Sequence, residues 1–188
     1  LEPAWLEHIS AQALASAERQ LQRARLLRAG IVDPLTGWNS RHYFLSRVRE
    51  QVAASVRDSK PATCLVIDVD GLGSLNEKRG VAAGDVVLVE VGNIIEAQMR
   101  ASDSFAHIGD DEFAALLPAT PPQFAARLAE RILAAVRAAP IVTALGQLEG
   151  VRVSIGIAGL DPAVLVAGTD RKATADEWLD VMRHAHRA

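Results

Sequence analysis

Two short clusters of carboxylates are the residues of this sequence best suited to chemistry. Asp68 and Asp70 end an apolar run, and Asp110, Asp111 and Glu112 lie between two short apolar runs. Alone, an acidic pair at a strand end or an acidic hairpin tip is more often a solvated turn than a metal site. If the runs are neighbouring strands, both clusters lie at one edge of a sheet. Hard oxygen ligands at that spacing suit Mg²⁺ bound together with nucleotide phosphates.

The spacing of apolar residues predicts the elements that must position these acids. Apolar residues four positions apart predict amphipathic helices, and β-branched apolar runs predict buried strands. We expect helices over residues 43–56, 85–99, 121–136 and 176–186, and strands over residues 63–69, 105–108, 112–117, 141–145 and 151–158. Their order predicts an α+β fold of the ferredoxin-like or palm-like kind, a central antiparallel-containing sheet flanked by helices.

An N-terminal helix is predicted before this domain. Residues 2–29 contain no glycine, and Gly30 stands at a normal helix stop. Leucine and alanine recur at heptad-like spacing in a thin seam: Leu14, Ala17, Leu21 and Ala24. A solvated helix that packs on its own domain and a signalling linker that pairs with another chain both fit two weak heptads. We therefore divide the chain into a linker helix, residues 1–30, and a domain, residues 31–188.

Composition and charge exclude several classes of protein. Twenty Lys and Arg stand against 23 Asp and Glu, a net charge of −3, which argues against a broad electrostatic grip on nucleic acid. The single cysteine, Cys64, excludes an internal disulfide framework and fits a reducing compartment, so we expect a cytoplasmic location. No apolar run reaches the roughly 18 residues of a membrane span. The chain starts at Leu1 without a secretory leader, and we expect it to be part of a longer protein.

Five short sequence motifs contain these acidic residues or lie close to them along the chain. Residues 33–45 read Asp-Pro-Leu-Thr-Gly-Trp-Asn-Ser-Arg-His-Tyr-Phe-Leu, and Val-Ile-Asp-Val-Asp at 66–70 is followed by Asn76, Gly80, Gly84 and Asp85. Arg-Ala-Ser-Asp at 100–103 precedes Gly-Asp-Asp-Glu-Phe at 109–113, and residues 151–158 read Val-Arg-Val-Ser-Ile-Gly-Ile-Ala. In order and spacing, these motifs resemble those of the GGDEF domain, the diguanylate cyclase family, from about residue 33 onward.

The resemblance implies a reaction and a role for each matching residue. Members of this family join two GTP molecules into cyclic di-GMP, each domain of an antiparallel pair presenting one GTP. The 3′-hydroxyl of one GTP attacks the α-phosphate of the other with the help of two Mg²⁺ ions. By position, Asp68, Asp111 and the Val69 carbonyl would ligate metal. Glu112 would act near the attacking hydroxyl.

The remaining matches concern the recognition of guanine and of the product. Asn76 and Asp85 would read the guanine edge, where an amide satisfies donors and acceptors and a carboxylate accepts from N1 and N2. Arg100 and Asp103 match the family's Arg-x-x-Asp inhibitory site. Arg100 would bind phosphate or the guanine O6/N7 pair in bidentate fashion, and Asp103 would accept from the Watson–Crick side.

Departures from the family pattern reduce the predicted contacts to the triphosphate. Asp110 stands where the family has a second glycine, which lets the backbone approach the nucleotide closely. At a separation of about 4 Å, the repulsion between the Asp110 carboxylate and one like charge of the triphosphate costs roughly 1 kcal/mol in water. At an effective dielectric constant of 20 it costs about 4 kcal/mol. Gly73 stands in place of the expected phosphate-facing lysine. Ser40, His42, Val81 and His107 stand where the family has Asn, Arg, His and Arg.

Two functions of different classes remain open. The first is a signalling domain with weak or no catalysis, which binds cyclic di-GMP at Arg100 and Asp103 or holds GTP unreacted. The second is an active diguanylate cyclase. We favour the first, because Asp110 and Gly73 act in the same direction. A purely structural dimerisation module would leave the acidic and base-reading residues unexplained. We expect a homodimer, formed through the N-terminal helix or through ligand, and no nucleic-acid partner.

Overall fold

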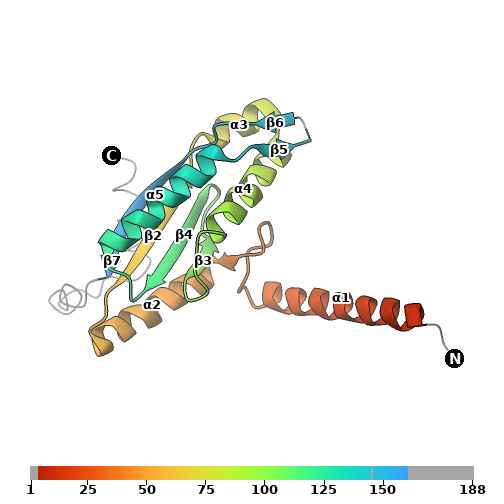
Figure 1. Ribbon diagram of the computed structural model, residues 1–188, viewed down its shortest axis with the longest axis horizontal. Helices are drawn as coiled ribbons and strands as arrows, with labels where there is room; N and C mark the ends of the chain where they lie inside the picture. The colour runs from red at the N-terminus through yellow and green to blue at the C-terminus, as the bar shows by residue number, and fades with distance from the viewer. Residues whose placement is uncertain (1–3, 145, 161–188) are drawn as a thin grey trace.

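Helices cover a central sheet in the computed structural model of the chain, which describes residues 4–144 and 146–160 (Figure 1). The helices are α1 (Ala4–Arg28), α2 (Arg41–Asp58), α3 (Leu72–Arg79), α4 (Val81–Glu96) and α5 (Pro122–Ala138). The strands are β1 (Asn39–Ser40), β2 (Ala62–Val69), β3 (Ser104–His107), β4 (Glu112–Pro118), β5 (Ile141–Thr143), β6 (Gly146–Leu148) and β7 (Val153–Leu160).

The main sheet has five strands in the order β1-β3-β4-β2-β7. β2 pairs in antiparallel fashion with both β4 and β7, and β3 and β4 form the predicted hairpin. The short β1 joins the edge in parallel with β3. The predicted α+β class, with an antiparallel-containing sheet flanked by helices, is therefore confirmed.

The alternation of side chains along β2 and β4 creates two cores, one on each face of the sheet. Cys64, Val66 and Leu116 face α2, where they pack with Phe44 and Val48. The intervening residues of the same strands face α4 and α5 and belong to the larger cluster: Leu65, Ile67, Val69, Phe113, Ala115 and Leu117. This period of two explains why a continuous apolar run forms a strand that is buried on both faces.

Helix α1 projects away from the sheet and its covering helices (Figure 1). It ends at Arg28, and Gly30 adopts a left-handed φ of 66°, as expected for a helix stop. Leu14 and Leu21 of the predicted seam are 62% and 55% exposed, so within this chain the seam is uncovered. No helix in the described part of the chain is long and apolar enough to cross a membrane.

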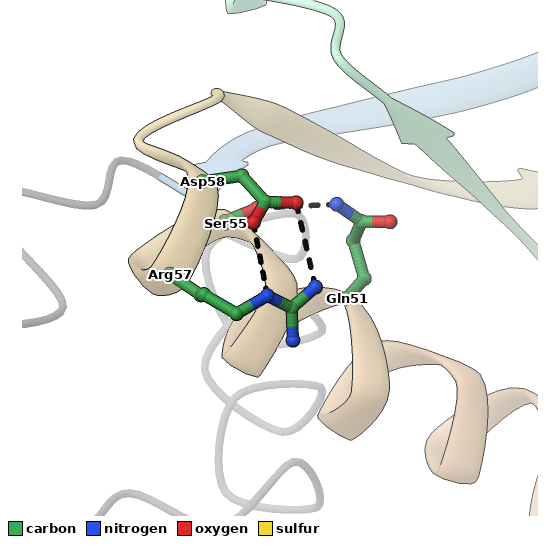
Figure 2. A network of polar contacts seen from close by, with 4 residues as sticks. All are labelled: Gln51, Ser55, Arg57 and Asp58. Carbon is green, nitrogen blue, oxygen red and sulfur yellow. Dashed lines mark hydrogen bonds and ion pairs between the residues drawn. The ribbon is translucent and has the colours of Figure 1, made fainter.

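Helix α2 begins and ends with local polar contacts. The hydroxyl of Ser40 caps its first turn by accepting from the Tyr43 amide, and it also donates to the Gly30 carbonyl. Near the other end, the Gln51 amide donates to the fully buried hydroxyl of Ser55 at 3.2 Å (Figure 2). The exposed ion pair of Arg57 and Asp58, at 2.9 Å, adds little stability because solvent screens it.

Two expectations about the elements need correction. The helix expected over 85–99 begins earlier, at Val81, and ends at Glu96, and the separate helix α3 precedes it. The strands expected over 141–145 and 151–158 are three strands, because β5 pairs with β6 in a separate two-stranded sheet while β7 pairs with β2. Gly146, the first residue of β6, has a φ of 109°, a backbone conformation that favours glycine. The helix expected over 176–186 lies outside the described residues.

Burial should make Cys64 unreactive in the folded protein. The side chain is 3% exposed, and desolvation raises the pKa of its thiol to about 12. Since the thiolate is the nucleophile, a thiol reagent at pH 8 should modify the native chain only at the rate of unfolding. In denaturant, one thiol per chain should react at once, which serves as the control. Rapid stoichiometric modification of the native protein would contradict the placement of β2.

Candidate functional site

The register of β2 and β4 brings the two acidic clusters to one edge of the sheet. Asp68 lies directly opposite Glu112, and the Val69 amide donates to the Asp111 carbonyl at 2.9 Å. Residues directly opposite in an antiparallel pair share a face, so Asp68 and Glu112 lie on the same side. Glu112 is buried and Asp68 is half-buried. The backbones of Asp68, Val69 and Asp111 thus lie at one edge of the sheet, and their role as metal ligands stays a prediction.

The tip of the β3–β4 hairpin carries the remaining acids. The amides of Ile108 and Gly109 both donate to the Glu112 carbonyl, at 2.9 and 3.3 Å, and close the turn. Asp111 is half-buried just before β4, while Asp110 is exposed. Among the described residues, positive φ values outside glycine occur at two positions, neither of them Asp110. The tip therefore accepts an aspartate without backbone strain, and what Asp110 changes is charge and space.

Asp70, the other acid of the first cluster, is tied to the neighbouring strand. Its carboxylate accepts from the Ser154 hydroxyl at 2.7 Å, and its amide donates to the Arg152 carbonyl at 3.0 Å. These bonds fix the exit from β2 against β7. Asp70 thereby has a structural role that the sequence pattern did not indicate.

The donor set at this edge fits a magnesium ion that shares its coordination with phosphate. Within residues 4–144 and 146–160, no group of three His, Cys, Asp or Glu side chains could by itself hold a metal ion. The predicted ligands are instead two carboxylates, from Asp68 and Asp111, and the Val69 carbonyl. Mg²⁺ usually takes one or two protein carboxylates and fills its other positions with water and substrate phosphates. These assignments stay predictions.

The two predicted guanine-reading residues lie on adjoining helices. Asn76 belongs to α3, and Asp85 lies in the first turns of α4; both are half-buried. The helices meet at Gly80, whose amide donates to the Asn76 carbonyl at 2.8 Å and whose φ is 82°. The side-chain oxygen of Asn76 is buried and has no hydrogen-bond partner in the described structure. The corner thus holds an amide and a carboxylate, whose donors and acceptors are complementary to those of guanine.

The predicted product site lies at the start of β3. The Asp103 carboxylate accepts from the backbone amide of Arg100 at 2.9 Å, so the motif closes its own turn. Because α4 stops at Glu96 and not at residue 99 as expected, Arg100 lies in the loop before β3 and not at the end of the helix. Arg100 is exposed, and it lines a hollow of about 390 Å³ together with Asp103.

Two further arginines line that hollow and were missed by sequence reasoning. Arg127 and Arg131 lie one turn apart on α5 and face the same space as Arg100. The Arg127 guanidinium lies 5.6 Å from the centre of the Phe124 ring, and Arg131 donates to the Gln98 carbonyl at 2.7 Å. Their four-residue spacing was visible in the sequence, but the packing of α5 beside α4 was not. The hollow is therefore more basic than the motif alone suggests.

A buried polar contact ties the exit of α1 to the hairpin. The Asp33 carboxylate accepts from the Thr36 amide and hydroxyl, both at 2.8 Å, and lies 3.1 Å from Nδ1 of His107. Burial alone would raise the pKa of Asp33, but the bonds from Thr36 and the interaction with His107 outweigh it. The pKa of Asp33 therefore lies below its ordinary value. His107 occupies the end of β3, just before the signature motif.

Comparisons with known proteins agree with this geometry. A family model described as diguanylate cyclase, GGDEF domain, matches residues 30–188. The bifunctional diguanylate cyclase/cyclic di-GMP phosphodiesterase MucR of Pseudomonas aeruginosa is 34% identical over 125 residues, which cover 66% of this chain and 18% of MucR. Diguanylate cyclase TpbB of the same species is 35% identical over 143 residues, covering 76% of this chain and 33% of TpbB. The chain thus spans a minor part of these relatives.

Solved structures show the same fold. The GGDEF domain of FimX from Pseudomonas aeruginosa matches with a TM-score of 0.69 and 28% identity, over 82% of this chain and 94% of that one. The GGDEF domain of PA1120 (YfiN or TpbB) from the same species gives a TM-score of 0.66 and 32% identity, over 81% and 92%. Both matches cover nearly the whole of the compared domain.

The low pKa of Asp33 predicts how stability depends on pH. A group whose pKa is lowered by folding stabilises the protein above its unfolded value, near 3.9, and loses that contribution as pH falls through the folded value. We expect Asp33→Asn to lower the free energy of unfolding at pH 7 by about 1–2 kcal/mol and to flatten its decline below about pH 4. Urea unfolding measured from pH 7 to pH 3 checks both effects.

The matched control is Asp58→Asn, which removes an exposed carboxylate from a surface ion pair and should change stability little. If Asp33→Asn and the unmodified chain lose stability in parallel over the acidic range, the assignment of this titration to Asp33 is wrong.

Proposed function

The chain belongs to the GGDEF family of diguanylate cyclase domains, and we propose that it acts in cyclic di-GMP signalling as a regulatory domain with weak or no catalysis. It binds GTP at the acidic edge of the sheet, or cyclic di-GMP at Arg100 and Asp103. The observation that carries this proposal is the hairpin tip, where the exposed Asp110 adds a charge beside the acids expected to face the nucleotide. GTP and cyclic di-GMP arise inside cells, which fits a cytoplasmic location.

The GTP site combines the corner of α3 and α4 with the edge of β2 and β4. Asn76 and Asp85 offer an amide and a carboxylate for guanine, and the acids of the sheet edge serve the phosphates. Asp68, Asp111 and the Val69 carbonyl would hold Mg²⁺. When bound, the ion supplies Lewis-acid stabilisation of the charge that develops on the phosphoryl oxygens. Glu112, buried opposite Asp68, would accept a proton from the attacking hydroxyl.

The loss of activity follows from two changes at the phosphates. Asp110 is a like charge near a triphosphate, and its desolvation inside a closed complex makes the repulsion stronger. Gly73 lies in the first turn of α3 with open space around it, so a lysine side chain could fit there but is absent. The alternative function, an active cyclase that condenses two GTP, uses the same residues and requires Mg²⁺ to offset the charge of Asp110.

The product site has its own support in the basic hollow beside Arg100. Arginines from α5 add positive charge that a cyclic dinucleotide, with two phosphates, would neutralise. Because Asp103 closes the local turn through the Arg100 amide, the position of Arg100 is set before any ligand arrives. A preformed site loses less entropy on binding than one that must be ordered.

A homodimer could form through helix α1, which projects from the domain with an exposed apolar seam. Helix α1 extends from the domain with Leu14 and Leu21 exposed, and pairing with a second copy would cover this seam. Each copy would then present one GTP to the other. A dimer linked by ligand at the basic hollow is the second route.

The test of the proposal is incubation of the chain with GTP and Mg²⁺, followed by chromatography of the nucleotides. We expect GTP binding with little or no cyclic di-GMP. Asp110→Gly should raise GTP affinity or turnover roughly fivefold or more, the factor that corresponds to about 1 kcal/mol. Gly73→Lys should add a similar factor, because the two positions act on different parts of the triphosphate and their effects should multiply.

Ser74→Lys is the matched control for Gly73→Lys, because it adds the same charge at the next exposed position of α3. Clear multiple-turnover synthesis by the unmodified chain would replace the proposal with the active-cyclase alternative. If neither GTP nor cyclic di-GMP binds, the proposed function is wrong in both its forms.

Calorimetric titration with cyclic di-GMP tests the product site. We expect micromolar binding that Arg100→Ala abolishes or weakens at least tenfold, since it removes a charged bidentate contact. Arg137→Ala is the control, because Arg137 is an exposed arginine in the last turn of α5 that does not line the hollow. An absence of heat at about 100 μM ligand, or equal binding by Arg100→Ala, would overturn the assignment.

A further inference from the structure

Gly84 makes room for the side chain of Asn76. A Cβ atom placed on Gly84 would lie 1.9 Å from Oδ1 of Asn76, 2.9 Å from its Cγ and 3.2 Å from its Nδ2. The first two distances are too short for non-bonded atoms. Any side chain at position 84 must therefore displace the carboxamide of Asn76 from its present place. The recess is formed by the absence of a side chain on α4 opposite α3.

Backbone conformation does not explain a glycine at this position. Gly84 lies in the first turns of α4 and is not among the glycines with positive φ. In a regular helix, glycine is less favourable than alanine by roughly 0.5–1 kcal/mol. The neighbouring helical glycine, Gly92, also has a steric reason, because its Cβ would lie 2.2 Å from the Trp38 ring. The reason for glycine at position 84 is therefore steric: the side chain of Asn76 occupies the space that a Cβ atom would fill.

The recess sets where the carboxamide of Asn76 lies. Oδ1 of Asn76 is the atom nearest to the Cβ position of Gly84, and it is buried without a hydrogen-bond partner in the described structure. Nδ2 lies farther from the Cβ position of Gly84. The next residue of α4, Asp85, is half-buried and carries a carboxylate. Asn76 beside Gly84, and Asp85 as the next residue of α4, thus place an amide and a carboxylate at the corner of α3 and α4.

This pair matches one edge of guanine better than any edge of adenine. Guanine offers two neighbouring donors, N1–H and N2–H₂, and acceptors on either side of them, whereas adenine lacks both the N1 proton and the exocyclic N2. A carboxylate takes the donors and an amide N–H takes an acceptor. We propose that Gly84 is a positioning residue for guanine: its recess holds Asn76 in the orientation that selects GTP over ATP. This inference rests on the proposed GTP site.

The experiment compares Gly84→Ala, Asn76→Ala and the double variant with the unmodified chain. Calorimetric titrations with GTP and with ATP, both with Mg²⁺, measure affinity and base discrimination. We expect Gly84→Ala to weaken GTP binding about tenfold, the effect of one lost hydrogen bond, and to leave ATP binding unchanged. Asn76→Ala should have the same effect. The double variant should bind GTP no more weakly than Asn76→Ala alone, within about twofold, because both changes remove one interaction.

Gly92→Ala is the matched control. It is the same substitution in the same helix with a comparable clash, but against Trp38 rather than Asn76. It should lower the thermal unfolding temperature while the ratio of GTP to ATP affinity stays that of the unmodified chain. A loss of discrimination in Gly92→Ala as large as in Gly84→Ala would show a general packing effect and overturn the proposal.

Thermal unfolding without nucleotide keeps the test decisive if Gly84→Ala folds poorly. Removing the Asn76 carboxamide opens the space that an alanine Cβ needs, so the double variant should unfold at a higher temperature than Gly84→Ala. The absence of this rescue would refute the recess. GTP binding that survives Gly84→Ala with its discrimination intact would refute the positioning role alone, whereas a lack of GTP binding by the unmodified chain would refute the proposed function.

Discussion

The antiparallel ladder between β2 and β4 runs from Ala62 opposite Pro118 to Asp68 opposite Glu112, with apolar side chains packed on both faces. Its register is strongly specified, because a slip by one residue would exchange the faces and move the side chains that pack against α2 into the opposite core. The acids begin where the apolar run ends, so the same register also sets which carboxylates meet. The location of the candidate site is in this sense a consequence of core packing, and a core substitution that shifts the ladder would disturb the site without touching it.

Much of the fold could be predicted because its central elements carry strong local signals. The apolar run of β2, the hairpin of β3 and β4, and the amphipathic helices α2, α4 and α5 all follow from periodicity. Helix α3 was missed because Gly73 and Ser74 weaken its helical signal, and two-residue β1 was missed because it exists through pairing with β3. The division of β5 from β7 likewise depends on which strand each one finds as a partner. Tertiary contacts decide these elements, and a single sequence does not display them.

The candidate site, like the fold, could be predicted only in part from the sequence. The sequence indicated which side chains are candidates for chemistry, because carboxylates, an amide and an arginine resemble a known family in their order and spacing. It did not show what surrounds them. Ser154 binding Asp70, the two arginines of α5 near Arg100 and the fit of Asn76 against Gly84 all join residues from different elements. Motif residues therefore define which chemistry is available, while their neighbours define orientation and local charge, and these appear only when helices and strands are packed.

The exit from α1 shows how such neighbours connect distant parts of the chain. Trp38 lies edge-on to both Phe105 and Phe113, at 5.4 and 6.0 Å between ring centres, and occupies the space left by Gly92. Asp33, at the other end of the same turn, reaches His107 at the end of β3. One short turn thus contacts α4 and both strands of the signature hairpin. Aromatic packing holds one end of the turn, and the polar contact of Asp33 with His107 holds the other. An arginine at position 107, which the family pattern leads one to expect, would instead present a longer side chain and a planar guanidinium to the same carboxylate. With histidine there, the ring also lies 5.1 Å from Phe113 between centres, so this residue joins the polar contact of Asp33 to the aromatic cluster.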